Sequence, residues 1–275
     1  MRLDCAGRVI TLDRAAVMGI LNVTPDSFFD GGHYVSVTNA VRRGEELVAD
    51  GADIVDIGGE STRPGSAPVK SAEEIRRVVP VIEQLAKLID VPISIDTSKP
   101  QVMKAAVEAG AGMINDVRAL QVDGAPEIAL SLGVPICLMH MRGEPMTMQD
   151  SPYYQDVVNE VRDFFDERLK ACQAIGISSD KLLIDPGFGF GKSMDHNRRL
   201  LLGLDAFAEL DLPMVVGFSQ KLFIGSLLGD FDRDRTIGSA GTALYAVQKG
   251  AKIVRTHDVS QTKDLIQCWH SLSDS

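Results

Sequence analysis

Eight short apolar segments recur along the chain, and a polar loop and an amphipathic stretch separate each one from the next. Continuous apolar segments of this length are typical of parallel strands that are covered on both faces. The segments lie near residues 16–21, 53–57, 92–96, 112–116, 134–139, 181–185, 213–217 and 252–255. Because strands alternate with helices in this pattern, the chain is expected to fold as an α/β protein with a parallel sheet.

The stretches between the apolar segments have the spacing of amphipathic helices. Val78, Val79, Ile82 and Leu85, for example, recur at helical spacing among Glu, Arg and Gln residues. Helices are predicted at residues 36–49, 71–89, 100–109, 124–132, 154–175, 195–203 and 258–272, with a region at 221–249 that contains a break.

Eight strands and eight helices in 275 residues favour a (β/α)8 TIM barrel over an open doubly wound sheet, which remains the alternative. Residues 2–12 are predicted to form a short N-terminal hairpin that turns at Ala6 and Gly7. Because no Pro-rich, Ser-rich or low-complexity linker interrupts the pattern, residues 1–275 are expected to form a single domain.

Charge and cysteine content narrow the classes of function. The net charge of −10 makes the chain a poor candidate for nucleic-acid binding, which depends on neutralising phosphates. The four cysteines form no CxxC pair, so neither a zinc site nor a redox pair is indicated. The N-terminus lacks the apolar region of a signal peptide, and no apolar run reaches membrane-spanning length. A cytoplasmic protein without a membrane partner is therefore expected.

Polar or charged residues follow almost every apolar segment. They are Asn22, Asp56, the loop 60–63, Asp96, Asn115 with Asp116, His140, Asp185, Ser219 with Lys221, and Arg255 with His257. Single cases have structural explanations, because Asp96 could cap the helix that starts at Pro100 and Asp185 could shape a turn. Together they predict a polar pocket at the carboxyl ends of the barrel strands, where the active sites of such barrels lie.

The residues of this expected pocket suggest two kinds of ligand group. Asp96, Asn115 and Asp185 follow buried strands and suit a ring that is rich in N–H donors, such as an aminopyrimidine. Lys221 could donate to a carbonyl or nitrogen of the same ring.

Cationic residues form the other half of the expected pocket. Arg63, Arg255 and His257 suit a phosphate group, and the amide oxygen of Asn22 suits Mg²⁺ alongside phosphate oxygens. Both halves together predict a heterocycle that carries a phosphate or pyrophosphate ester.

Several other features are interpreted more simply. Phe28 and Phe29 lie on a loop after the first buried strand, which favours a ligand-contacting flap. Residues 186–193 resemble a P-loop, but Pro186 stands where Gly is required, so a turn close to a ligand with Phe190 stacking is expected. The three histidines at 140, 196 and 270 are interpreted as structural, and the tyrosines at 153 and 154 as packing residues that open a helix.

Residues 19–32 and 51–65 resemble the two signature segments of the dihydropteroate synthases. Shorter matches follow in the same order at 94–100, 114–116, 138–141, 183–192 and 254–259, so the resemblance extends from about residue 17 to 259. It implies a (β/α)8 barrel, usually dimeric, that acts in folate biosynthesis. The implied enzyme joins 6-hydroxymethyl-7,8-dihydropterin pyrophosphate to p-aminobenzoate with Mg²⁺ and releases pyrophosphate. The implied mechanism is dissociative, and members of the family are sulfonamide targets.

The resemblance also implies roles for individual residues. The implied pterin contacts are Asp96, Asn115, Met139, Asp185, Phe190 and Lys221. The implied pyrophosphate contacts are Asn22, Thr62, Arg63, Arg255 and His257, with Asn22 also a metal ligand. The implied p-aminobenzoate contacts are Phe28, Thr62, Pro64 and Ser219. Catalysis is expected to depend on Asp96, Asp185, Lys221 and Arg255.

Two segments depart from the family pattern, and one of them is the loop 28–30, which has Phe29 where the family often has Ser. Residues 219–222 read Ser-Gln-Lys-Leu, where the family usually reads Ser-Arg-Lys-Ser. Altered binding of p-aminobenzoate and of sulfonamides is therefore expected, with pterin binding intact. Two alternative functions are a pterin-binding paralogue without synthase activity and a methyltransferase that uses a methylated folate and a corrinoid partner.

Overall fold

Eight parallel strands form a nearly closed barrel in the computed structural model, which describes residues 1–24, 33–61, 65–144 and 146–273. The strands are β3 (Ala16–Asn22), β4 (Ile54–Gly58), β5 (Ile93–Asp96), β6 (Met113–Asp116), β7 (Ile136–Met139), β8 (Leu182–Asp185), β9 (Val215–Gly217) and β10 (Ile253–Thr256). They lie in the order β8-β7-β6-β5-β4-β3-β10-β9, and a bridge between Ile184 and Met214 joins the two ends. The prediction of a TIM barrel is confirmed.

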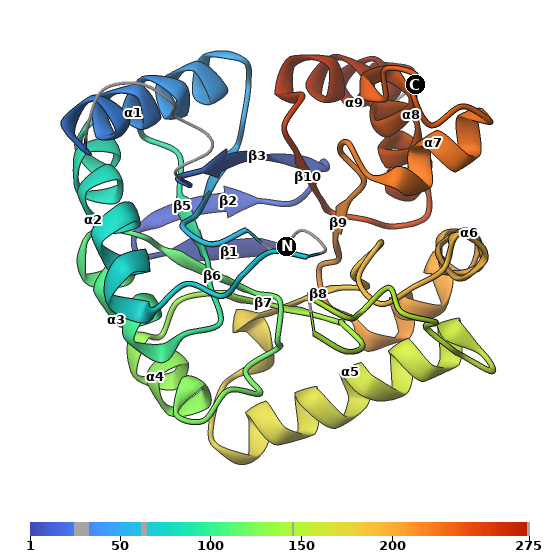
Figure 1. The fold of residues 1–275 in the computed structure, drawn as a ribbon, viewed down its shortest axis with the longest axis horizontal. Coiled ribbons are helices and arrows are strands. Elements are labelled where there is room, and N and C mark those ends of the chain that lie inside the picture. Colours follow the sequence, from blue (N-terminus) through green and yellow to red (C-terminus); the bar gives the residue numbers. More distant parts are fainter. Residues whose placement is uncertain (25–32, 62–64, 145, 274–275) are drawn as a thin grey trace.

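The helices surround the barrel (Figure 1). They are α1 (His33–Ala49), α2 (Ser71–Leu88), α3 (Pro100–Glu108), α4 (Ala125–Leu132), α5 (Val157–Ala174), α6 (Met194–Leu202), α7 (Leu222–Leu228), α8 (Thr236–Gln248) and α9 (Val259–Ser273), with short 3₁₀ turns at Ser179–Lys181 and Leu204–Leu210. The predicted break in 221–249 separates α7 from α8. Gly229 ends α7 in the left-handed conformation, with φ of 68°.

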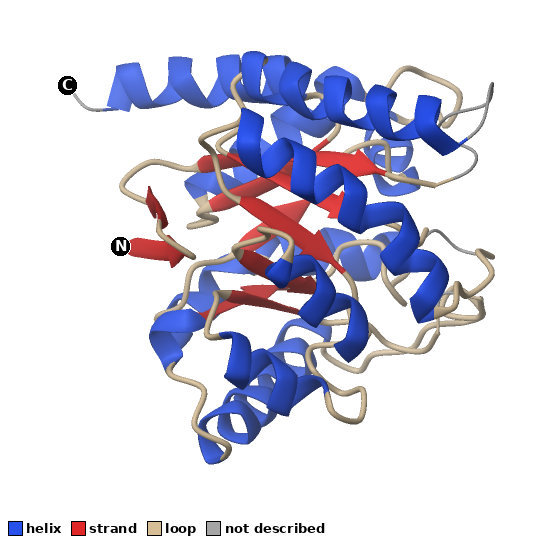
Figure 2. Cartoon of the chain, turned by 90° about the vertical axis from the view of Figure 1, so that its left-hand side faces the viewer, coloured by secondary structure: helices blue, strands red, loops and turns tan. Residues whose placement is uncertain are grey.

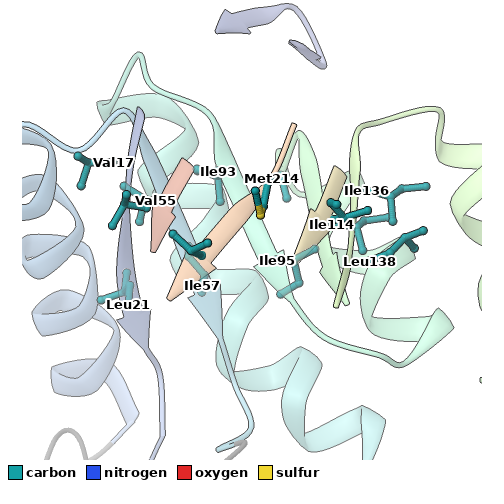
Figure 3. Packing of buried hydrophobic residues seen from close by; sticks show 14 of the residues in the cluster. Val17, Leu21, Val55, Ile57, Ile93, Ile95, Ile114, Ile136, Leu138 and Met214 are labelled. Carbon is teal, nitrogen blue, oxygen red and sulfur yellow. The ribbon is translucent and has the colours of Figure 1, made fainter. Parts of the chain in front are cut away.

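Side chains alternate between the two faces of each strand. Outward-facing residues such as Val17, Val55 and Ile95 belong to one large core between the strands and the helices (Figure 3). Inward-facing residues such as Met18 and Ile54 belong to a second, smaller cluster inside the barrel. Side chains on a strand alternate with a period of two. The residue two positions after each inward apolar residue therefore also faces into the barrel, closer to the carboxyl end of the strand.

The N-terminal hairpin covers the end of the barrel where the strands begin (Figure 2). It consists of β1 (Arg2–Cys5) and β2 (Arg8–Thr11), as predicted, and its residues Leu3 and Cys5 belong to the inner apolar cluster. Gly112 allows the close approach, because a Cβ atom there would lie 2.3 Å from the carbonyl oxygen of Cys5. The hairpin thus packs against the inner apolar cluster at the end of the barrel where the strands begin.

One prediction at a helix boundary is wrong. The helix expected to open at the two tyrosines begins at Val157 instead, because the Asp156 side chain accepts the backbone N–H groups of Val158 and Asn159. Tyr154 lies outside the helix and is buried, whereas Tyr153 is exposed. Among the described residues, none of the helices has the length and apolar character needed to span a membrane.

Candidate active site

A polar layer lies directly above the apolar cluster inside the barrel. Each residue of this layer faces inward because it lies two positions after an inward apolar residue on the same strand. Asp56 lies two positions after Ile54, and Asp185 lies two positions after Leu183. The inward residues of this layer are Ile20, Asp56, Asp96, Asn115, Met139, Asp185, Gly217 and Arg255. The polar residues that the sequence predicts at the strand ends therefore lie in one ring of inward positions on neighbouring strands.

Arg255 lies between two buried carboxylates. Its Nε donates to Asp56 Oδ2 and one of its terminal nitrogens donates to Asp96 Oδ2, both at 2.6 Å. Asn115 Nδ2 also donates to Asp56 Oδ2, at 3.2 Å. Such short charge-assisted bonds fix the plane of the guanidinium. The sequence assigns Arg255 to the phosphate half of the pocket, and in the structure two of its guanidinium nitrogens donate to carboxylates.

Burial shifts the pKa values of this group. Desolvation raises the pKa of Asp96 to about 7, although the positive charge of Arg255 opposes the shift. The negative charges of Asp56, Glu74 and Asp116 add to it. Burial acts to lower the pKa of Arg255, but the two carboxylates together outweigh it and raise that pKa, so the guanidinium stays charged. Asp96 does not cap the following helix, because its Oδ2 accepts from Arg255 instead.

Asp185 and Lys221 lie on the other side of the ring. Asp185 Oδ1 accepts the backbone N–H of Gly187 at 2.8 Å, so this carboxylate does shape the turn that the sequence suggested. Lys221 Nζ donates to the carbonyl oxygen of Phe188 and lies 4.9 Å from the centre of the Phe190 ring. Burial lowers the pKa of Lys221 to about 8, with the charge of Asp185 acting in the opposite direction.

The buried side chain of Lys192 holds the loop between β8 and α6 by hydrogen bonds to its backbone. Lys192 Nζ donates to the carbonyl oxygens of Gly187 at 2.8 Å and Phe190 at 3.2 Å, and lies 2.8 Å from His140 Nδ1. Burial lowers the pKa of His140, so the neutral ring can accept from the lysine. Gly187 has φ of 67°, and a Cβ atom there would lie 2.0 Å from the carbonyl oxygen of His140. The loop and its neighbour thus pack backbone against backbone.

A chain of hydrogen bonds runs along the rim above the ring. Asn22 Nδ2 lies 3.5 Å from His257 Nε2, and His257 Nδ1 lies 2.9 Å from Ser219 Oγ. Ser219 Oγ also donates to Asp258 Oδ2 at 3.3 Å, and Gln220 Nε2 donates to the same oxygen at 3.0 Å. These bonds are compatible with one tautomer of His257, in which Nδ1 carries the proton. They connect the ends of β3, β9 and β10.

In the segment 219–222, which departs from the family pattern, Gln220 and Leu222 have different surroundings. Gln220 adopts φ of 60° and directs its amide to Asp258, while Arg235 donates to its backbone oxygen. Leu222 opens α7 and is 57% exposed. Among the predicted site residues, Phe28, Thr62, Arg63 and Pro64 lie outside the residues that the structure describes.

Comparison with known proteins decides the family. Residues 18–257 match the family of pterin binding enzymes. Dihydropteroate synthase of Escherichia coli K12 is 48% identical over 267 residues, which cover 97% of this chain and 95% of that protein. The chain is a member of the dihydropteroate synthase family.

Solved structures of this family agree with the barrel described above. Dihydropteroate synthase of Xanthomonas albilineans with 4-aminobenzoic acid aligns with a TM-score of 0.94 at 51% identity and covers 100% of this chain and 98% of that chain. A complex of the enzyme from the same organism with 7,8-dihydropteroate aligns with a TM-score of 0.91 at 48% identity and covers 100% of both chains.

Several of the residues that the sequence predicts for the site lie in one inward layer of this dihydropteroate synthase. Asp96, Asn115 and Asp185 lie in one inward layer, and Met139 completes it on β7. The sequence does not identify Lys192 as a site residue, because nothing in it marks a lysine after a glycine-rich turn as buried. The sequence marks Asp56 only as a strand-end residue, although its position two residues after an inward apolar residue is the signal for its orientation.

Proposed function

We propose that this dihydropteroate synthase joins 6-hydroxymethyl-7,8-dihydropterin pyrophosphate to p-aminobenzoate and forms 7,8-dihydropteroate and pyrophosphate. The observation that carries the proposal is the inward layer at the carboxyl ends of the strands, where Asp96, Asn115 and Asp185 lie together with Lys221 close by. Family membership supplies the reaction, and this layer supplies a place for a ring that is rich in N–H donors.

The pterin ring binds in this layer. Its exocyclic amine and ring N–H groups donate to the carboxylates of Asp96 and Asp185, which can accept further hydrogen bonds besides those from Arg255 and Gly187. Lys221 donates to a ring oxygen or nitrogen, and Asn115 can both donate and accept. Met139 and Phe190 provide apolar contact for the faces of the ring.

The pyrophosphate lies nearer the rim. Asn22 and His257 are connected there by their hydrogen bond, and Thr62, Arg63 and Arg255 complete the proposed contacts. Mg²⁺ would neutralise the charge that develops on the leaving pyrophosphate.

The donor set at the rim fits a metal that arrives with the substrate. Asn22 turns its amide nitrogen to His257, which directs the amide oxygen away from that ring. Mg²⁺ commonly takes one or two protein oxygens together with substrate phosphates and water. No cluster of three or more His, Cys, Asp or Glu side chains suited to a metal occurs in the described part of the chain. Asn22 is therefore proposed as the protein ligand, with substrate oxygens supplying the others.

The reaction follows a dissociative course. The bond between the pterin methylene carbon and the pyrophosphate oxygen breaks first, and the electron pair leaves with pyrophosphate. The weakly nucleophilic nitrogen of p-aminobenzoate then attacks the cationic carbon and loses a proton. Buried carboxylates stabilise the cation through fixed charge, so no protein nucleophile is needed.

The second substrate is proposed to bind beside Ser219, with Phe28, Thr62 and Pro64 from the loops. Gln220 and Leu222 supply neither the cation nor the hydroxyl that the family usually has in this segment. We therefore expect a higher KM for p-aminobenzoate and weaker sulfonamide inhibition than in relatives with the usual residues.

The double variant Gln220→Arg/Leu222→Ser tests this expectation. It should lower the KM for p-aminobenzoate by roughly tenfold, about the effect of one charge-assisted hydrogen bond, and leave the KM for pterin pyrophosphate unchanged. A double variant whose KM for p-aminobenzoate and sulfonamide sensitivity match those of the wild type would refute the expectation.

Product formation tests the proposed function. The purified protein is incubated with pterin pyrophosphate, p-aminobenzoate and Mg²⁺, and 7,8-dihydropteroate and pyrophosphate are quantified. Equal amounts of both products support the synthase. Tight binding of pterin pyrophosphate without product would indicate the silent pterin-binding paralogue instead.

A homodimer in the cytoplasm is proposed as the working form. Leu227, Phe231 and Ile237, on α7, α8 and the loop between them, are 46%, 52% and 70% exposed. Exposed apolar side chains that lie on neighbouring elements favour a protein interface. All four cysteines are free, as expected in a reducing compartment. Sedimentation analysis tests the dimer, and cell fractionation tests the compartment.

A further inference from the structure

We propose that Asp56 is a positioning residue for this reaction, which orients Arg255 and Asn115 and leaves one excess negative charge beneath the pterin ring. The inference rests on the proposed function. Asp56 has no assigned contact with either substrate, and its side chain lies inside the barrel on β4 with no exposed surface.

The geometry makes Asp56 a shared acceptor. Its Oδ2 receives Arg255 Nε at 2.6 Å and Asn115 Nδ2 at 3.2 Å. Asp96 holds the guanidinium at one of its terminal nitrogens, at 2.6 Å. A planar guanidinium that is held at two nitrogens cannot rotate. Asp56 therefore fixes which N–H groups of Arg255 remain directed to the proposed pterin site. The same oxygen orients the amide of Asn115, which is proposed to contact the ring.

The charges in this group do not cancel. Asp56 and Asp96 carry two negative charges when ionised, and Arg255 carries one positive charge. A site with one excess negative charge suits the methylene cation better than it suits the neutral ring of the substrate. Stabilisation that is stronger in the transition state than in the ground state raises kcat rather than lowering KM.

An unpartnered oxygen indicates that Asp56 is more than a structural partner for Arg255. Asp56 Oδ1 is buried and has no hydrogen-bond partner in the described residues, and neither has the buried Ser94 Oγ on the adjacent strand. A carboxylate that only anchored Arg255 would be expected to have both oxygens satisfied. Asp56 therefore keeps one acceptor oxygen without a donor inside the barrel, besides the oxygen that Arg255 occupies.

Asp56→Asn tests the proposal, with Ser94→Ala as the matched control. Asparagine keeps the size and one acceptor oxygen but removes the charge. Ser94 pairs with Asp56 in the strand register and is also fully buried, but its hydroxyl forms no hydrogen bond with Arg255 or Asn115. The wild type, Asp56→Asn and Ser94→Ala are compared for kcat, for both KM values and for the pH dependence of kcat/KM.

The expected result has two parts. In Asp56→Asn, kcat falls about 100-fold, the typical effect of a misplaced catalytic group, while the KM for pterin pyrophosphate changes by less than about threefold. The acid limb of the pH profile also moves to lower pH. Asp96 is faced by Arg255 from β10, Asp56 from β4, Asp116 from β6 and Glu74 from α2, and loss of the Asp56 charge removes one cause of its raised pKa. Ser94→Ala behaves as the wild type.

Two outcomes would overturn the inference. An unchanged kcat with an unchanged acid limb in Asp56→Asn would show that the charge is not used. An equal loss of kcat in Ser94→Ala would show that packing, not charge, is responsible. If Asp56→Asn does not fold, Asp56→Ser is measured in the same way, because its hydroxyl still accepts one hydrogen bond. A wild type that forms no dihydropteroate would refute the proposed function instead, so the two failures are distinguishable.

Discussion

Substitution of Arg255 by Gln should destabilise the fold in a pH-dependent way. The wild-type guanidinium donates to Asp56 and Asp96 at 2.6 Å, and these residues are 0% and 8% exposed. Removal of one partner from a buried ion pair costs about 3–5 kcal/mol, because the remaining charge stays desolvated. Glutamine can restore at most one neutral hydrogen bond, worth about 1 kcal/mol. We therefore expect a loss of about 3 kcal/mol in the free energy of unfolding at about pH 8.

The loss should be smaller at lower pH. Without the guanidinium, the pKa of Asp96 rises above its wild-type value of about 7. The folded variant then binds more protons than the unfolded chain, whose aspartates titrate near pH 4, so stability decreases as the pH rises through the folded pKa. Between about pH 8 and about pH 6, the difference from the wild type should shrink by about 1 kcal/mol or more.

Urea denaturation at both pH values measures this effect. Arg76→Gln serves as the control, because Arg76 pairs with Glu73 on the surface of α2 with its side chain 66% exposed. Exposed ion pairs contribute less than about 1 kcal/mol, with little dependence on pH in this range. A loss below about 1 kcal/mol for Arg255→Gln, or an equal loss at both pH values, would refute the reasoning.

Three further predictions concern the loop, the pH profile and the metal. Gly187→Ala should lower the free energy of unfolding, measured by urea denaturation, by about 3 kcal/mol. Gly187 has φ of 67°, and an added Cβ would lie 2.0 Å from the carbonyl oxygen of His140. Gly229→Ala, with φ of 68° and open space around the Cβ, should cost only about 1 kcal/mol, and equal losses would contradict the steric argument. The kcat/KM for pterin pyrophosphate should rise through about pH 7 as Asp96 ionises and fall above about pH 8 as Lys221 loses its proton, so a profile flat across this range would count against both assignments. Chelation by EDTA should lower product formation at least about tenfold, added Mg²⁺ should restore it, and full activity in excess chelator would exclude the proposed metal.

The fold could be predicted because the hydrophobic pattern of each segment matches the burial of that segment in the barrel. The apolar segment predicted at 53–57 forms β4 (Ile54–Gly58), which is buried on both faces, and the amphipathic stretch predicted at 71–89 covers the barrel with one face as α2. The start of α5 could not be predicted from the same pattern. The buried Tyr154 extends the apolar spacing upstream of the helix, and only the Asp156 cap marks the true beginning.

Only those residues of the candidate site that lie at the ends of strands could be predicted from the sequence. Asp96 and Asp185 end parallel strands, and such ends meet at one edge of a barrel. The pairing of Arg255 with Asp56 was not predictable, because the two residues are 199 positions apart and meet only through the barrel register. The burial of Lys192 likewise depends on how a glycine-rich turn folds back onto His140, which local sequence does not specify.

The central claim is that inward carboxylates of the barrel hold the pterin, and Asp185→Asn tests it most directly. The amide can still accept the backbone N–H of Gly187, so the turn should persist without the negative charge. Isothermal titration should show that pterin pyrophosphate binds at least about tenfold more weakly than to the wild type, since a charge-assisted hydrogen bond is lost. Asp205→Asn, at an exposed carboxylate paired with Lys249, should bind as the wild type does. Wild-type affinity in Asp185→Asn would contradict the claim.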